Sequence, residues 1–126
     1  MWGPEAGARA RERRMTDRVE LVPGTLDMMV MKAVAAEALH GFGIARWIEA
    51  VTGDRLTVEE GALYPALHRM EKRGLLASEW GRTQRGRRAR YYRLTEDGRE
   101  ALAGLKKRWE DSTWAVRQVM EADGRA

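Results

Sequence analysis

Apolar residues recur at helical spacing between residues 59 and 72. Leu63, Leu67 and Met70 stand at positions i, i+4 and i+7, so one face of a predicted helix can be buried. The opposite face keeps small, aromatic and basic side chains accessible to a partner. These residues are Gly61, Tyr64, Pro65, His68, Arg69 and Lys72. The pattern predicts a helix with one face for the core and one face for recognition.

Two further helices are predicted before this one. The first begins with Thr25 as its cap and has the broad apolar face of a central helix. Its apolar residues are Leu26, Met29, Val30, Ala33 and Val34. After an interruption at His40–Gly43, the second helix spans residues 44–51 and ends at Gly53. Its inward residues are Ile44, Trp47, Ile48 and Val51, and Leu56 beyond it would form a brief strand against a later hairpin.

The start of the helix near residue 60 is open to two interpretations. Thr57 and Glu60 have the spacing of a capping box, whereas a cap at Glu59 is the competing choice. Pro65 lies inside the predicted helix, where it lacks an N–H donor and crowds the carbonyl of Gly61. We therefore expect a loosened first turn.

A strand, a basic loop and a second strand follow, and this predicted hairpin ends near Leu94. No acidic residue lies between Gly81 and Leu94, and Gly86 makes the loop flexible. Five arginines of this segment are candidates for contact with a partner: Arg82, Arg85, Arg87, Arg88 and Arg90. Such a charge run is often only a solvated face. Here it adjoins a helix with a basic face, so contact with nucleic acid is the favoured interpretation.

The last predicted helix begins at Thr95, a good N-cap, and Glu96 and Asp97 suit the helix dipole. Residues at three- and four-residue spacing form a coiled-coil-like seam: Leu102, Leu105, Trp109, Ser112, Val116 and Val119. This seam either packs on the first helix of the same chain or pairs with a second subunit. Burying each large apolar residue contributes roughly 1.5 to 3 kcal/mol, which favours a homodimer. Trp114 lies off the seam.

Composition narrows the function classes. The 126 residues carry a formal net charge of +4 and no cysteine, which excludes disulfides, thiolate catalysis and cysteine-based zinc sites. His40 and His68 have no partner at ligand spacing, so packing or surface roles are expected and neither a metal nor a cofactor is predicted. No nucleophile and base, paired carboxylates or phosphate-binding glycine loop stands at a recognisable spacing. We therefore expect a protein that is not an enzyme.

The N-terminal region differs from the rest of the chain. Residues 1–20 are expected to form a disordered basic arm, with little to bury and arginines at Arg9, Arg11, Arg13 and Arg14. Met15 is an alternative native start. No apolar run approaches the ~18 residues of a membrane span, and the N-terminus lacks a signal-peptide core. The prediction is a soluble cytoplasmic protein without membrane contact.

Several motifs together resemble one family. LVPGTLDMMVMKAV, HGFGIA, EEGALYPALHRMEKRGLL, EWG and RRARYYRLTEDG are similar to segments of the PadR family of bacterial transcriptional regulators. The resemblance implies a mainly α fold with a small β-hairpin, namely a winged helix-turn-helix over residues 21–95. It also implies a C-terminal dimerisation helix over residues 96–126. Members usually act as repressors at operator DNA, and a small molecule often relieves repression.

These expectations define a mechanism. The recognition helix should enter the major groove and the hairpin should lie along the backbone or minor groove. A homodimer would read an inverted-repeat operator. Trp109 is either a core residue or, as the resemblance to multidrug-responsive relatives implies, part of a site for a planar aromatic effector. An RNA-binding or protein-interaction module is the alternative function, because basic charge alone does not distinguish nucleic acids.

Overall fold

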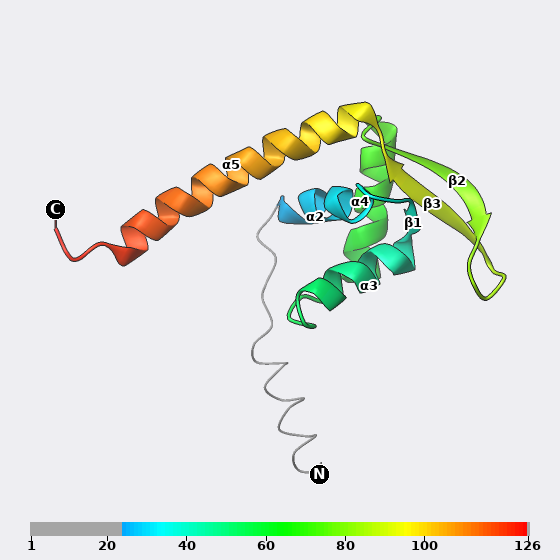
Figure 1. The fold of residues 1–126 in the computed structure, drawn as a ribbon, viewed down its shortest axis with the longest axis horizontal. Helices are drawn as coiled ribbons and strands as arrows, with labels where there is room; N and C mark the ends of the chain where they lie inside the picture. Colours follow the sequence, from blue (N-terminus) through cyan, green and yellow to red (C-terminus); the bar gives the residue numbers. More distant parts are fainter. Residues whose placement is uncertain (1–23, 126) are drawn as a thin grey trace, which may run out of the picture.

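The computed structural model describes residues 24–125, so the predictions about residues 1–20 and Met15 lie outside the described part. Three helices and a short strand precede a two-stranded hairpin, and a long helix closes the described part of the chain (Figure 1). In order they are α2 (Thr25–Ala33), β1 (Leu39–His40), α3 (Gly41–Val51), α4 (Glu60–Lys72), β2 (Leu76–Arg82), β3 (Arg88–Leu94) and α5 (Glu96–Glu121). The strands form an antiparallel sheet in the order β1-β3-β2. The predicted mainly α fold with a small hairpin is confirmed.

The core lies where α2, α3 and α4 meet the base of the hairpin. The residues predicted to face inward from α4, which are Leu63, Leu67 and Met70, are buried, and Ala66 is buried beside them. Val30 and Met31 from α2 join them, as do Ile44 and Ile48 from α3. Burial of this face holds α4 against the other helices and leaves its opposite face in solvent, as the 3.6-residue period requires.

The starts of two helices differ from the predictions. Gly24, with φ of 93°, is the N-cap of α2, so Thr25 is the first helical residue rather than the cap. Helix α3 begins at Gly41, three residues earlier than predicted. His40 is the N-cap of α3 rather than part of a break before it. Its Nδ1 accepts a hydrogen bond from the Gly43 N–H at 3.0 Å.

The predicted strand at Leu56 is wrong. Leu56 is buried in the loop between α3 and α4, and the strand beside the hairpin is β1, which pairs with Tyr91 and Tyr92 of β3. The loop is held by α3 instead of the sheet. The Leu56 N–H donates to the Thr52 hydroxyl at 3.2 Å, and the Val58 N–H donates to the Glu49 carboxylate at 3.1 Å. These side chains satisfy donors that a strand would have used in a ladder.

Glu59 is the N-cap of α4, so the capping box of Thr57 and Glu60 does not form. The Glu59 carbonyl accepts hydrogen bonds from the N–H groups of Ala62 and Leu63, and its side chain makes no capping bond. The helix continues without a break through Pro65. Pro65 is exposed on the recognition face of this helix.

Two residues predicted to face inward from α3 are not buried. Trp47 is 38% exposed and Val51 is 62% exposed, whereas Ile44 and Ile48 are buried. The inward face of α3 is therefore narrower than its apolar pattern. The excess apolar surface lies beside α2 and the start of α5.

Helix α5 begins as predicted. The Thr95 hydroxyl accepts a hydrogen bond from the Gly98 N–H at 2.9 Å. Leu102 and Leu105 pack partly against the core, and α5 contacts α2 there. Beyond them the helix extends away from the other elements (Figure 1). Within residues 24–125, the first part of the predicted seam packs inside the chain and the later part does not.

Candidate nucleic-acid interface

The recognition face predicted for α4 is exposed along its length. Gly61, Pro65, His68 and Lys72 are all accessible, and open space surrounds the Gly61 α-carbon. Tyr64 joins this face to the start of α3, because a Cβ placed on Gly41 would lie 3.0 Å from the Tyr64 ring and hydroxyl. Glycine at position 41 therefore permits the close approach of α3 and α4.

Arg69 differs from its neighbours on this face. Its guanidinium donates a hydrogen bond to Asp27 Oδ1 in the first turn of α2, and the two side chains form an ion pair. Both side chains remain partly accessible, so water screens the pair and its contribution to stability is small. The contact nevertheless places the Arg69 charge between α2 and the recognition face.

The hairpin of β2 and β3 forms the wing, and its tip is a hydrogen-bonded turn. The Thr83 N–H donates to the Arg87 carbonyl at 2.8 Å, and the Gly86 N–H donates to the Thr83 carbonyl at 2.9 Å. Gly86 has φ of 79°, which favours glycine. Arg82 Nη1 donates to the Gly86 carbonyl at 3.0 Å. Among residues 24–125, no carboxylate pairs with Arg85 or Arg87.

Two wing arginines contact an exposed tryptophan instead. The guanidinium carbons of Arg88 and Arg90 lie 4.6 and 5.3 Å from the centroid of the Trp80 ring. Arg90 Nε also donates to Ser78 Oγ at 2.7 Å, and its Nη2 lies 3.5 Å from Glu71 Oε2. These contacts attach the wing to the end of α4.

Tyr92 lies beneath these residues and is buried. Burial raises the pKa of its phenol above the usual value of 10.0, and the negative charge of Glu71 raises it further, while Arg90 acts in the opposite direction. The neutral phenol is therefore the form that the folded chain favours.

Sequence reasoning missed Asp27, Glu71, Ser78 and Trp80 as parts of this surface. Trp80 carried a usable signal, because two-residue alternation in a hairpin places it on the same face as Arg88 and Arg90. Glu71 and Ser78 lie seven residues apart on different elements. Their contact depends on the turn after α4, where Gly74 has φ of 77°.

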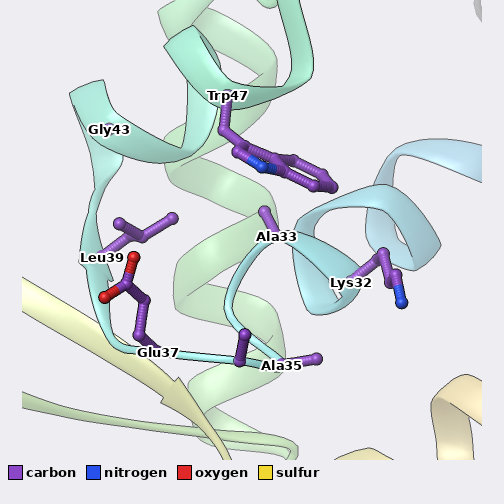
Figure 2. A pocket seen from close by; sticks show the side chains of 8 residues that line it. Lys32, Ala33, Ala35, Glu37, Leu39, Gly43 and Trp47 are labelled. Atoms are coloured by element: carbon purple, nitrogen blue, oxygen red, sulfur yellow. The ribbon is translucent and has the colours of Figure 1, made fainter. Parts of the chain in front are cut away.

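Two apolar hollows lie away from the recognition face. One, of about 550 Å³, lies between the end of α2, β1 and α3, where Trp47 extends over Ala33 and Lys32 (Figure 2). The other, of about 580 Å³, lies between α2, α3 and α5, and its lining includes Met28, Val51 and Trp109. Lys32, Ala35 and Trp47 line both hollows, which are therefore adjacent.

The later part of the α5 seam is exposed. Trp109 is 47% exposed, Val116 is 59% exposed and Val119 is 74% exposed, and Ser112 is accessible too. Trp114, predicted to lie off the seam, is also exposed.

No helix within residues 24–125 is long and apolar enough to cross a membrane. In the same range no three side chains of histidine, aspartate or glutamate gather in a group that would hold a metal ion.

Helices α3 and α4 with the hairpin after them have the arrangement of a winged helix-turn-helix protein. The sequence profile of the transcriptional regulator PadR-like family matches residues 30–104. The chain belongs to the PadR family, and it is a transcriptional regulator rather than an enzyme.

Solved structures support this assignment. A transcriptional regulator from Clostridium thermocellum is 25% identical, with a TM-score of 0.69, over 75% of this chain and 92% of that one. A PadR family transcriptional regulator from Eggerthella lenta is 28% identical, with a TM-score of 0.68, over 94% of this chain and 95% of that one. A sequence relative gives the same assignment. This relative, a transcriptional regulator of Mycobacterium tuberculosis, is 48% identical over 54 residues, which are 43% of this chain and half of that protein.

Proposed function

We propose that the protein binds operator DNA as a homodimer and represses transcription until a small molecule binds. The observation that supports this proposal best is that the exposed face of α4 adjoins an arginine-rich wing, since α4 contacts β2. The exposed face of α4 presents Tyr64, His68 and Lys72, and the wing presents Arg85 and Arg87 without carboxylate partners in residues 24–125. Helix α4 would enter the major groove, and the wing would follow the adjacent backbone or minor groove.

The other predicted contacts have different roles in this proposal. Gly61 and Pro65 allow the backbone of α4 to approach the bases closely, since neither has a long side chain. Arg69 pairs with Asp27. To contact a base or phosphate, its guanidinium would either leave Asp27 or use N–H groups that Asp27 does not occupy. Arg82, Arg88 and Arg90 would add positive potential along the wing.

The dimer would form through α5. The exposed apolar residues beyond Leu105 need cover, and the surface lined by Met28, Trp47 and Val51 has the complementary apolar character. We infer that α5 of a second copy covers this surface. Two recognition helices would then read half-sites about 34 to 36 Å apart, or one helical turn, in an inverted repeat.

The effector site is proposed in this region as well, in a flat pocket between the two subunits. Trp109 lines the hollow of about 580 Å³ between α2, α3 and α5, and an indole ring offers a face for stacking with a planar aromatic compound. The test is quenching of tryptophan fluorescence by planar compounds. Quenching that persists unchanged in Trp109→Ala excludes this residue as the ligand contact.

Selection of bound duplexes from a random DNA pool tests the main proposal. It should return an inverted repeat, and affinity for that repeat should fall with salt with a log-log slope on the order of −5 if about six phosphates are neutralised per dimer. Arg87→Ala should weaken binding to all sequences and make the slope less steep by about 1 per subunit. His68→Ala should instead change the preference among sequences.

Arg93→Ala is the matched control for charge. Arg93 is an exposed arginine near the base of β3, outside the proposed contact set, and its removal should change the slope less than Arg87→Ala. Competition between duplex DNA and structured RNA addresses the alternative function. Stronger binding to the RNA, or no preference among duplexes at near-physiological salt, would refute the proposed operator binding.

A further inference from the structure

A series of contacting side chains connects the recognition helix α4 to the wing: Glu71, Ser78, Arg90 and Trp80. Arg90 Nε donates to Ser78 Oγ at 2.7 Å, and the Ser78 hydroxyl donates in turn to Glu71 Oε2 at 2.6 Å. The same carboxylate oxygen lies 3.5 Å from Arg90 Nη2. The Arg90 guanidinium contacts the Trp80 ring, as described above. The series therefore spans the last turn of α4 and both strands of the wing.

The series continues toward the wing tip through one more arginine. The guanidinium carbon of Arg88 lies 4.6 Å from the centroid of the Trp80 ring, which is closer than the guanidinium carbon of Arg90. Trp80 is 57% exposed, so burial does not explain its place in the hairpin. The negative face of an indole ring attracts a guanidinium and limits its directions. Arg88 thus has a defined position relative to α4, whereas Arg85 and Arg87 at the tip have no carboxylate partner among residues 24–125.

We propose that Glu71, Ser78, Arg90 and Trp80 are positioning residues, which preset Arg88 so that wing and recognition helix engage DNA in one fixed geometry. This inference rests on the proposed operator binding. Holding a long side chain in its bound direction before binding removes an entropy cost that association would otherwise incur. Glu71 acts in this way although its negative charge, taken alone, repels phosphate.

The sign of the Glu71 effect separates positioning from electrostatics. Glu71→Ala removes one negative charge beside the proposed interface, and Glu79→Ala removes the same charge from an exposed position on β2. If charge alone mattered, both variants would bind the selected duplex equally or more tightly than the unaltered protein. Positioning predicts that Glu71→Ala weakens binding by about two- to tenfold per subunit, while Glu79→Ala does not.

Trp80 provides a second and independent test. Trp80→Leu keeps every arginine, so the log-log salt slope should stay unchanged while affinity falls by about two- to tenfold per subunit. Arg88→Ala should lower affinity and also make the slope less steep by about 1 per subunit. In the Arg88→Ala background, Trp80→Leu should have little further effect. Trp80→Phe keeps an aromatic face and should retain most of the affinity.

All variants are compared on the full chain, with the selected duplex, and after unfolding curves show that each variant is folded. Equal effects of Glu71→Ala and Glu79→Ala would overturn the proposal. So would independent, additive effects of Trp80→Leu and Arg88→Ala. If the unaltered protein prefers no duplex, operator binding itself fails. If it selects an inverted repeat and these variants still behave alike, only the positioning role fails.

Discussion

Substituting Gly98 should destabilise the protein, although alanine is the better helix former. Gly98 is buried in the first turn of α5, and a Cβ at this position would lie 2.1 Å from the Leu75 carbonyl oxygen and 2.6 Å from Leu94 Cδ1. The oxygen belongs to the backbone, so it cannot rotate away as a side chain would. Gly98→Ala must therefore push α5 away from the start of β2 by about 1 Å to restore an ordinary contact.

The displaced carbonyl also supports the cap of α5. Leu75 O accepts hydrogen bonds from the Thr95 N–H at 3.2 Å and from the Thr95 hydroxyl at 3.0 Å. Overpacking costs about 1–3 kcal/mol, and loss of cap geometry costs about 1 kcal/mol. Alanine in place of glycine returns about 1 kcal/mol through helix propensity. We expect Gly98→Ala to lower the free energy of unfolding by about 1–3 kcal/mol.

Gly104→Ala is the matched control on the same helix. A Cβ at Gly104 would meet only the end of the Arg108 side chain, at 3.5 Å, so this variant should gain up to about 1 kcal/mol. Urea unfolding at equal protein concentration measures both, because association would make stability depend on concentration. Equal stabilisation by the two substitutions would refute the steric argument for Gly98.

Three further predictions follow from individual contacts. His40→Ala removes the acceptor for the Gly43 N–H and should lower the free energy of unfolding by about 1 kcal/mol in the same assay, whereas His40→Asn should keep most of it. The raised pKa of Tyr92 means that the folded chain binds its proton more tightly; stability is therefore retained below pH 10 and falls as pH rises above 10, and Tyr92→Phe should reduce that fall in alkaline urea titrations. Gly41→Ala should displace Tyr64 and change the order of preference among selected duplexes, with a smaller effect on the salt slope; an unchanged preference would contradict the role of that close approach.

The exposed apolar residues indicate how the fold and the proposed assembly are related. Trp47 and Val51 continue the apolar pattern of α3 beyond what one copy of the chain buries. Val116 and Val119 do the same for α5. Exposed apolar patches mark interaction sites. The apolar side chains that a single copy leaves exposed therefore support the proposal of a second subunit.

The boundaries of the elements could be predicted only in part. The periodicity of Leu63, Leu67 and Met70 identified the buried face of α4 correctly, because that face contacts a continuous core. The cap of α3 could not be predicted, since histidine is an unusual N-cap and its role depends on the orientation of its ring nitrogen. Leu56 forms no strand. The strand that pairs with β3 on the side away from β2 is Leu39–His40.

Local patterning in the amino-acid sequence was enough to define a helix with a basic outer face, an arginine-rich hairpin and a long final helix with an apolar seam. These features depend on residues within one or two turns of each other, so short-range rules describe them. Tertiary structure alone decided which charges of the proposed interface are paired. Arg69 meets Asp27 across 42 residues, and Arg90 meets Glu71 and Ser78, because the packing of α2 and the turn after α4 bring distant positions together. Sequence spacing carries no direct record of such distances.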